Sequence, residues 1–292
     1  MNWEGLAFQA VDGLASASGL FFVAAGLSLI FGVTRIINIA HGSLYMLGTY
    51  IAVTLVTAMG GAFGFWGGIV AAALVVGILG ALIEIVLLRR IYVAPELFQL
   101  LATFALLLVI NDAALYFWGP EDLLGPRAPG LRGAIEVLGR RMPSYDVFLI
   151  VVAPAVLIAL HAVFARTRFG RLVRAATEDR EMLGALGVNQ SVLFTAVFAL
   201  GALLAGLGGA LYASLYSLEV SMGSSYILKG VEAAILAGIG TVMGSLVGGI
   251  VLGVTEAVGS LYFPQAYRDA YGLIFLVLIL LLRPAGLFGG RR

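Results

Sequence analysis

RTRFGRLVRAATEDREMLGALGVN, residues 166–189, carries five arginines and four carboxyl or amide side chains between two long apolar runs. A polar segment in this setting predicts a loop held against a membrane. Its second half predicts a short helix that Thr177 caps and that Gly187 ends in the left-handed conformation. Glu178 and Asp179 then lie in the first turn, where negative charge is favourable. A short capped helix outside the bilayer is a structure that a partner can bind.

The basic residues that lead into this helix orient the loop. By the positive-inside bias, arginines at this density place a short loop in the cytoplasm. They are Arg166, Arg168, Arg171 and Arg174. A basic loop can also do no more than orient a membrane protein, and that alternative stays open. It does not account for the capped helix that follows.

The composition excludes a soluble globular protein. Hydrophobic residues make up 61% of the 292 residues and charged residues 11%, whereas charged residues reach about 25% in soluble domains. The mean hydropathy is +1.06. We therefore expect an all-α, polytopic transmembrane helical bundle that forms a single domain, residues 1–292, in a lipid bilayer. The 39 glycines suit helices whose backbones approach closely in lipid.

Few residues are available for catalysis or metal binding. No cysteine is present and histidine occurs twice, which excludes a thiolate site and argues against a metal centre. Lys229, the only lysine, follows Leu228 rather than glycine, so the chain has no GxxxxGK[ST] phosphate-binding loop. We expect no catalytic residue, no metal and no cofactor bound by this chain. The net charge of +1 gives no indication of nucleic-acid binding.

Apolar runs joined by short loops predict eight to nine crossings, with the N-terminus outside and the C-terminus in the cytoplasm. Residues 166–190 form a cytoplasmic loop on this reading. Residues 119–145 are rich in proline and glycine, and span parity makes them an extracytoplasmic loop of irregular structure. The four arginines of that loop count against its placement outside.

One segment in the second half is predicted to be a broken helix. Residues 226–262 are too long for one span and too rich in glycine for one continuous helix. We expect two pieces, residues 227–239 and 244–261. Broken helices of this kind mark binding or gating regions in transporters.

Small residues predict close helix contacts in the same half. Gly201, Ala205 and Gly209 are spaced as a small-xxx-small surface. A weak sign of an internal repeat comes from the similar spacing of Gly80 with Glu84 and of Gly253 with Glu256.

Polar side chains inside the apolar runs usually face a bundle interior or a water-filled path. In residues 34–55, polar or small residues recur every three or four positions and would share one helix face. They are Arg35, Asn38, Gly42 and Tyr45, flanked by His41 and Ser43. Arg35 can instead reach the headgroups while its neighbours bond to freed backbone. The pathway candidates are Asn38, His41, Ser43, Tyr45, Glu84 and Glu256.

Four blocks of the sequence resemble one family. They are residues 34–52, 166–189, 229–259 and 282–289, and they fall in the same order as in that family. The chain resembles the branched-chain amino acid permeases of bacterial ATP-binding-cassette importers, and especially the high-affinity leucine, isoleucine and valine subunits. Importers of this class generally show Glu-Ala-Ala ahead of the coupling glycine. This chain has Glu181-Met182-Leu183 instead, so the match to the general motif is loose.

The resemblance implies a pore subunit of the bacterial inner membrane and a set of partners. These are a second homologous permease, two cytoplasmic ATPase subunits that bind ATP and Mg²⁺, and a periplasmic solute-binding protein. The resemblance also implies that residues 166–190 dock on an ATPase. The residues expected to take part in this coupling are Arg171, Arg174, Thr177, Glu178, Asp179, Glu181 and Gly187.

Two other classes of function remain as alternatives. A secondary transporter driven by an ion gradient would need Glu84, Asp112 and Glu256 to meet near the midplane. An intramembrane hydrolase would pair a serine with a histidine, but His41 and Ser43 would point about 200° apart on a helix. The choice among branched-chain amino acids, urea, amides and aromatic acids stays open, as does that between a homodimeric and a heterodimeric pore.

Overall fold

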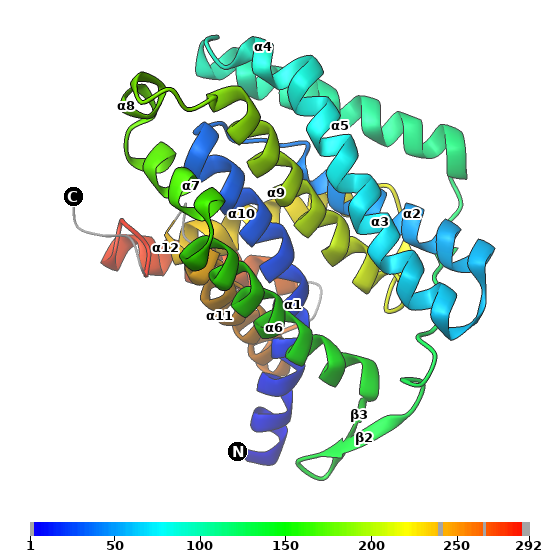
Figure 1. Ribbon diagram of the computed structural model, residues 1–292. Coiled ribbons are helices and arrows are strands. Elements are labelled where there is room, and N and C mark those ends of the chain that lie inside the picture. The colour runs from blue at the N-terminus through cyan, green and yellow to red at the C-terminus, as the bar shows by residue number, and fades with distance from the viewer. Residues whose placement is uncertain (1–2, 239–241, 265–266, 288–292) are drawn as a thin grey trace.

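The computed structural model is a bundle of helices, which confirms the predicted fold class (Figure 1). It describes residues 3–238, 242–264 and 267–287. The helices are α1 Trp3–Thr34, α2 His41–Met59, α3 Gly61–Ile83, the π-helix η1 Glu84–Leu88, α4 Arg89–Ile91, α5 Glu96–Trp118, α6 Ser144–Arg166, α7 Arg168–Glu178, α8 Arg180–Ala185, α9 Gln190–Tyr212, α10 Met222–Ala237, α11 Val242–Tyr262 and α12 Arg268–Leu282. Two short antiparallel strand pairs join β1 Leu123–Leu124 to β4 Ser217–Leu218 and β2 Ala134–Val137 to β3 Arg140–Pro143.

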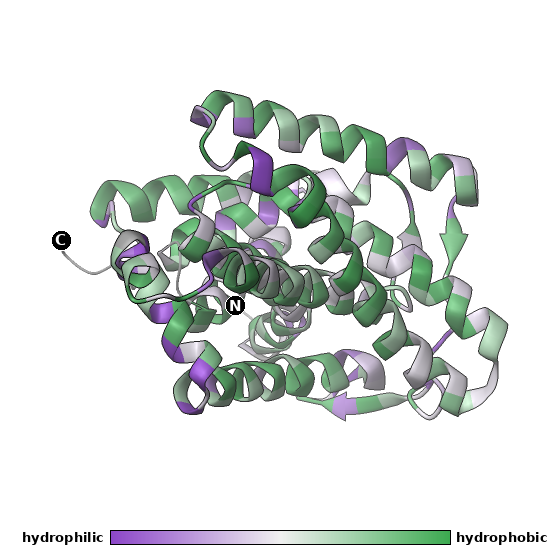
Figure 2. Ribbon diagram, turned by 45° about the horizontal axis from the view of Figure 1, so that its top comes forward, coloured by the Kyte–Doolittle hydropathy of each residue, from purple (hydrophilic) through white to green (hydrophobic). Residues whose placement is uncertain are grey.

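Seven of the described helices are long and apolar enough to cross a membrane. The helices α10 and α12, with 16 and 15 residues, are shorter. If α10 and α12 also cross the membrane, the total is nine crossings, the upper end of the predicted range of eight to nine. The long helices are hydrophobic along most of their length (Figure 2), and only 22% of the apolar spans of α5 and of α6 is buried inside the bundle. Apolar side chains exposed in this way face lipid.

The bundle has two distinct ends. At one end the last turns of α1 pack with α7, α8 and the first turns of α9 in one apolar cluster. We call this the α7–α8 end. The hairpin of β2 and β3 lies at the opposite end, near the start of α1 (Figure 1). Because the end of α1 meets the start of α9, these two central helices run in opposite directions.

The contacts support an internal repeat. The helix α1 packs most extensively on α11, and α9 packs most extensively on α3. The helix α2 packs on α3 and α9, while α10 packs on α11 and α1. Of the outer helices, α5 packs against α2, and α12 packs against α10 and more extensively against α11. Because α1 and α9 run in opposite directions, the set α1, α2, α3, α5 and the set α9, α10, α11, α12 are inverted copies of one arrangement, as in many transporters.

The two copies meet at matched residues of α2 and α10. A Cβ on Gly42 would collide with the carbonyl oxygen of Gly223. One turn further along each helix, the rings of Tyr45 and Tyr226 stack with centroids 4.4 Å apart. The two helices therefore cross at near backbone contact.

The predicted small-residue surface of α9 is a contact surface. Gly201 faces Gly26 and Ile30 of α1, and Ala205 is fully buried. Gly209 lies against the backbone of Tyr45 in α2. One helix thus approaches two neighbours through its small residues.

The predicted helical face through Arg35 and Asn38 is wrong. The helix α1 ends at Thr34, and α2 begins only at His41. Arg35 takes a positive φ of 57°, which turns the chain out of the helix. Only Gly42 and Tyr45 of the predicted face lie on one helix.

Two other predictions are refined by the structure. The break in residues 226–262 occurs after Ala237, where Gly238 has a φ of 97°; residues 239–241 lie outside the described part. The segment 119–145 is not wholly irregular, because β2 and β3 form a hairpin across Leu138 and Gly139. Both turn residues have positive φ, as a tight two-residue hairpin requires.

Candidate functional site

The polar segment after α6 folds into two short helices, which we call the α7–α8 projection (residues 168–187). The hydroxyl of Thr167 accepts a hydrogen bond from Gly170 N at 3.1 Å and caps α7. The carboxylate of Asp179 accepts one from Met182 N at 2.9 Å and caps α8. Gly187 ends α8 with a φ of 79°, as predicted. Both ends of α8 are therefore fixed by local chemistry.

The predicted cap at Thr177 is wrong. Thr177 lies in the last turn of α7 and donates its hydroxyl hydrogen to Val173 O at 2.9 Å. The helix continues through this position because Val173 and Ala176 are buried against α1 and α9. Glu178 consequently ends α7, and only Asp179 occupies the start of α8.

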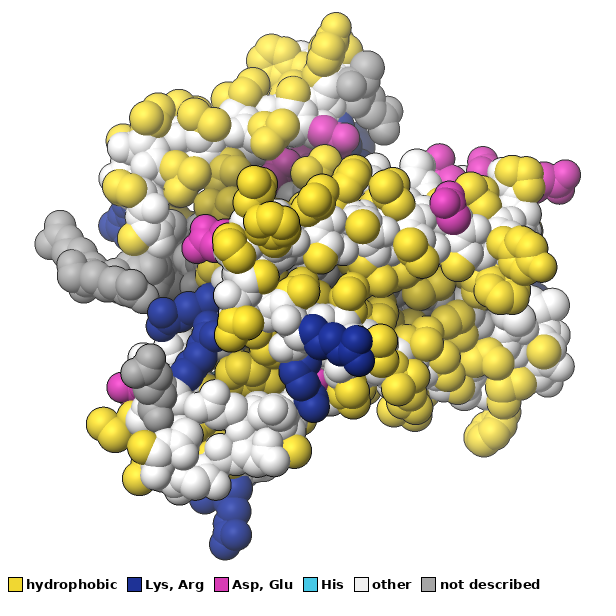
Figure 3. All heavy atoms as spheres, turned by 90° about the horizontal axis from the view of Figure 1, so that it is seen from above, with side chains coloured by type: hydrophobic (Ala, Val, Ile, Leu, Met, Phe, Trp, Pro, Cys, Tyr) yellow, Lys and Arg dark blue, Asp and Glu magenta, His cyan; other side chains and the backbone are white. Residues whose placement is uncertain are grey.

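The projection has an anchored side and a free side. Leu183 of α8 is buried in the cluster with α1 and α9. Met182 and Leu186, on the other side, are 60% and 74% exposed. Figure 3 looks onto this end and shows basic side chains among apolar ones across the face. Two exposed apolar side chains on a firmly packed polar projection suit contact with another protein.

The other predicted coupling residues lie on the same projection. The side chains of Arg171, Arg174, Glu178 and Asp179 are exposed. Arg174 also donates to Phe164 O, the carbonyl near the end of α6, at 2.5 Å. Glu181 belongs to α8, but its side chain lies outside the described part.

Arg35 faces the projection from the end of α1. A hollow of about 390 Å³ is lined by Arg35, Glu178, Asp179 and Arg180. Burial lowers the pKa of Arg180, and the nearby charge of Arg35 lowers it further. The two arginines thus bring positive charge to the base of the projection.

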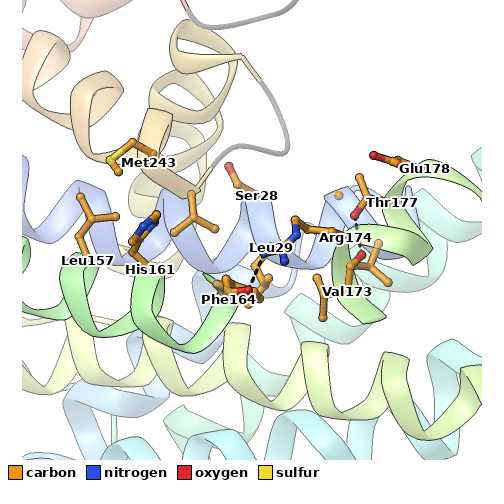
Figure 4. A pocket seen from close by; sticks show the side chains of 13 residues that line it. Ser28, Leu29, Leu157, His161, Phe164, Val173, Arg174, Thr177, Glu178 and Met243 are labelled. Atoms are coloured by element: carbon orange, nitrogen blue, oxygen red, sulfur yellow. Dashed lines mark hydrogen bonds between the residues drawn. The ribbon is translucent and has the colours of Figure 1, made fainter. Parts of the chain in front are cut away.

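A second pocket lies beside the projection. It has a volume of about 310 Å³ and is lined by residues of α1, α6, α7 and the start of α11 (Figure 4). Its wall is mostly apolar, with polar side chains from His161, Arg174, Thr177 and Glu178. The projection is therefore packed on α1 and α9 but leaves space between α7 and α11.

Three predicted pathway residues lie inside the bundle. Asn38, His41 and Tyr45 are all buried, with at most 1% of each exposed. The amide group of Asn38 makes no hydrogen bond to any described residue. Ser43, also buried, donates to Asn111 Oδ1 of α5 at 3.2 Å. Tyr45 stacks on Tyr226 where the two inverted copies meet, and His41 lies beside Gly26 of α1.

Glu84 is held at the α7–α8 end. It is fully buried in η1, and Arg89 Nη2 lies 3.0 Å from Glu84 Oε2. Thr195 of α9 donates to the same oxygen at 2.5 Å, and the hydroxyl of Tyr92 donates to Oε1 at 3.1 Å. Burial raises the pKa of Tyr92, and the charge of Glu84 raises it further. This network joins η1 to α9.

Glu256 belongs to a separate charged cluster toward the opposite end. Lys229 Nζ of α10 lies 2.9 Å from Glu256 Oε2 and 2.8 Å from Asp269 Oδ1. Arg268 Nε lies 3.2 Å from Glu256 Oε2. A pocket of about 270 Å³ opens beside these side chains and is walled by Tyr212, Tyr216 and Tyr226 with Ser16, Leu20 and Ser225. Glu84 and Glu256 are not brought together, which the ion-driven alternative required.

A multi-pass helical bundle with an inverted repeat and buried charged groups is typical of membrane transport proteins. The chain belongs to the family described as branched-chain amino acid transport system / permease component, whose model matches residues 9–282. The predicted family is thereby confirmed.

Relatives match nearly the whole chain. The high-affinity branched-chain amino acid transport system permease protein BraD of Pseudomonas aeruginosa is 30% identical, over 96% of this chain and 95% of its own length. The corresponding LivH protein of Salmonella typhimurium is 28% identical, over 96% and 94%. A probable branched-chain amino acid transport permease protein LivH of Methanocaldococcus jannaschii is 24% identical, over 92% and 88%. No solved structure matches the chain.

Sequence reasoning missed two features of these sites. The sequence-based set of coupling residues leaves out Met182 and Leu186, although apolar residues in a polar loop are a usable signal of a contact surface. The partners of Glu256 were also missed. Lys229 was noted only for the phosphate loop it does not form, yet a lone lysine in an apolar helix is itself a sign of an intramembrane partner.

Proposed function

We propose that this protein is the transmembrane permease subunit of an ATP-binding-cassette importer in the bacterial inner (plasma) membrane. It forms half of a translocation pathway for branched-chain or related amino acids. A second homologous permease completes the pathway, and two cytoplasmic ATPase subunits bind ATP and Mg²⁺. The relatives BraD and LivH are branched-chain amino acid transport proteins, which supports the substrate class.

The single observation that carries this proposal is the construction of the α7–α8 projection. Its inner side is buried against α1 and α9, one helix from each inverted copy. Its outer side presents Met182 and Leu186. A force applied to the projection therefore acts on both copies at once. The projection is thus a lever suited to transmit the movement of a separate ATPase to the permease. Arg171, Arg174, Thr177, Glu178, Asp179, Glu181 and Gly187 belong to this lever.

The opposite end supports a second partner, a solute-binding protein. Three arginines line a pocket of about 430 Å³ there, and we call Arg127, Arg132 and Arg141 the outer arginines. None of them takes part in an ion pair between described residues. The positive-inside bias disfavours unpaired arginines on the extracytoplasmic side of the membrane. Their presence there is explained if they bind the acidic surface of a docking protein.

The substrate pathway is proposed to include Asn38, His41, Ser43, Tyr45, Glu84 and Glu256. The first four lie in or just before α2, where the two copies meet. Buried polar groups at such an interface are typical of transport pathways.

Reconstitution tests this function against an ion-driven transporter. The permease pair is placed in liposomes with or without its ATPase subunits, and uptake of radiolabelled leucine is followed with the binding protein outside. Uptake is expected only with the ATPases and internal ATP, and it persists after an ionophore collapses ion gradients. Uptake that needs no ATPase and stops with the ionophore would establish the secondary transporter instead.

A further inference from the structure

The outer face of α5 carries a carboxylate at membrane depth. Asp112 is exposed and lies six residues before Trp118, where α5 ends. At 1.5 Å per residue this is about 9 Å below the end of the helix. The aromatic residues 116–118 mark the level of the lipid headgroups above it. The other exposed charged side chains of the seven described spans lie in a first or last turn, and they are Arg90, Glu96 and Arg166.

The inner contacts of α5 leave Asp112 without a partner. The helix lies at the edge of the bundle and packs on α2 (Figure 1). Ile110 and Ala114 are buried there, and Asn111 accepts a hydrogen bond from Ser43 at 3.2 Å. Asp112 takes part in no ion pair or side-chain hydrogen bond between described residues. Because its short side chain cannot reach the headgroups as lysine or arginine does, its position indicates a donor on a neighbouring protein.

Asp112 belongs to one exposed stripe along α5, which we call the α5 stripe. Its members recur every three or four positions and share one face of the helix. They are Phe98, Ala102, Ala105, Val109, Asp112 and Tyr116, and none of them is buried. The first half of the stripe borders a groove of about 550 Å³ that is lined by apolar residues. Small residues in this groove allow another helix to approach closely.

We propose that the α5 stripe is the contact surface for the second permease subunit, which places a basic side chain against Asp112. In a single chain the stripe would face lipid, which suits its apolar residues but not the carboxylate. A partner that meets α5 from the groove to Asp112 must itself cross the membrane, which excludes the ATPases and the solute-binding protein. The inference rests on the proposed function, because it names the surface through which the two permeases assemble.

The charge of Asp112 favours a partner that differs from this chain. Two copies with the same membrane orientation are related by an axis along the membrane normal, so that equivalent residues face each other at one depth. A contact centred on the α5 stripe would bring the two Asp112 carboxylates together, and like charges at close range repel each other. A homologous permease with arginine or lysine at this depth neutralises the carboxylate instead. The stripe therefore indicates a heterodimeric pore.

Site-specific photocrosslinking tests the contact surface. The photoreactive residue p-benzoylphenylalanine replaces Val109 of the stripe or, as a control, Ile158 of α6; these residues are 64% and 68% exposed. The complex with the second permease and the ATPases is irradiated in nanodiscs, and mass spectrometry identifies the adducts. Val109 is expected to give an adduct with the second permease and Ile158 to give lipid adducts only. The absence of a protein adduct at Val109 would overturn the surface, and an adduct between two copies of this chain would overturn the heterodimer.

Charge reversal tests the pairing of Asp112. Asp112→Lys is expected to lower recovery of the second permease with the tagged chain at least tenfold, and Asp112→Asn should lower it less. Glu96→Lys makes the same change at an exposed carboxylate of α5 that lies outside the stripe, and it should keep the parental recovery. Changing the basic residue nearest the Val109 adduct to glutamate should restore the assembly of Asp112→Lys. Parental recovery of Asp112→Lys, or no restoration by the exchange, would refute the pairing.

The outcomes separate this surface from the proposed function. ATP-driven uptake by a complex that gives no Val109 adduct would overturn the surface and leave the function standing. Uptake that needs no ATPase and stops with an ionophore would overturn the function itself.

Discussion

Replacing Gly187 with valine is expected to uncouple ATP hydrolysis from uptake. Gly187 has a φ of 79°, and a Cβ there would meet no atom within 4 Å. The cost of the substitution is therefore backbone strain alone. For a side-chain-bearing residue, the left-handed conformation costs about 1–2 kcal/mol, and β-branched residues are at the upper end.

The helix α8 has little stability with which to absorb that cost. It has six residues, far below the length at which an isolated helix is stable. Its order depends on the cap from Asp179, the stop at Gly187 and the burial of Leu183. Removing about 1–2 kcal/mol from this local equilibrium lowers the population of ordered α8 relative to the frayed state by roughly 5- to 30-fold.

The assay is the number of ATP molecules hydrolysed per leucine imported in proteoliposomes. Gly187→Val should raise this ratio several-fold while membrane insertion stays intact. Gly187→Asn is the matched control, since asparagine tolerates the left-handed conformation and should keep the parental ratio. Hydrogen exchange of the α8 amides reports the helix directly. Faster exchange with an unchanged ratio would refute the role of α8 as a lever.

Three further predictions address the other surfaces. Leu186→Asp should weaken ATPase binding by about 1.5–3 kcal/mol, the value of one buried apolar side chain, whereas Leu186→Met should not; pull-down affinity measures the difference. Neutralising the outer arginines to glutamine should weaken binding of the solute-binding protein and flatten its salt dependence, but Arg140→Gln should not, because Arg140 lies over the ring of Phe8; unchanged affinity would refute that docking surface. Gly42→Ala should lower the melting temperature in detergent by forcing α2 from α10, whereas Gly67→Ala, with space for a Cβ, should not; equal melting curves would contradict the close crossing.

Local rules of the sequence were sufficient for several elements. The apolar runs gave the long helices because a span needs about 20 apolar residues. The stop at Gly187 and the break at Gly238 followed from the conformational freedom of glycine, and both residues have positive φ. These features depend on neighbouring residues in the chain only.

Other features depend on packing that no local rule contains. Thr177 and Asp179 are both good caps, and the choice between them was made by the burial of Val173 and Ala176 against helices far away in sequence. The ion pair between Lys229 of α10 and Glu256 of α11 likewise depends on which helices lie side by side. Spacing along one helix cannot show which helix lies beside it.

The inverted repeat explains how the two ends of the molecule can be linked. Glu84 of η1, directly after α3, and Glu256 of α11 belong to corresponding parts of the two copies, because α3 and α11 each pack against the long central helix of the other copy. Glu84 binds Thr195 of α9 near the projection, and Glu256 lies toward the hairpin end with Arg268, whose guanidinium is 3.3 Å from Ser16 Oγ of α1.

Each copy thus ties its buried carboxylate to the central helix of the other copy, once at each end. The centre between these ties is the close crossing of α2 and α10, which has no room to compress. On the proposed coupling, a force on α9 at the projection acts directly on the Glu84 network. Because the crossing has no room to compress, we expect the resulting movement to be a rotation of one copy about the other, which would change the distance between α1 and α12 at the opposite end.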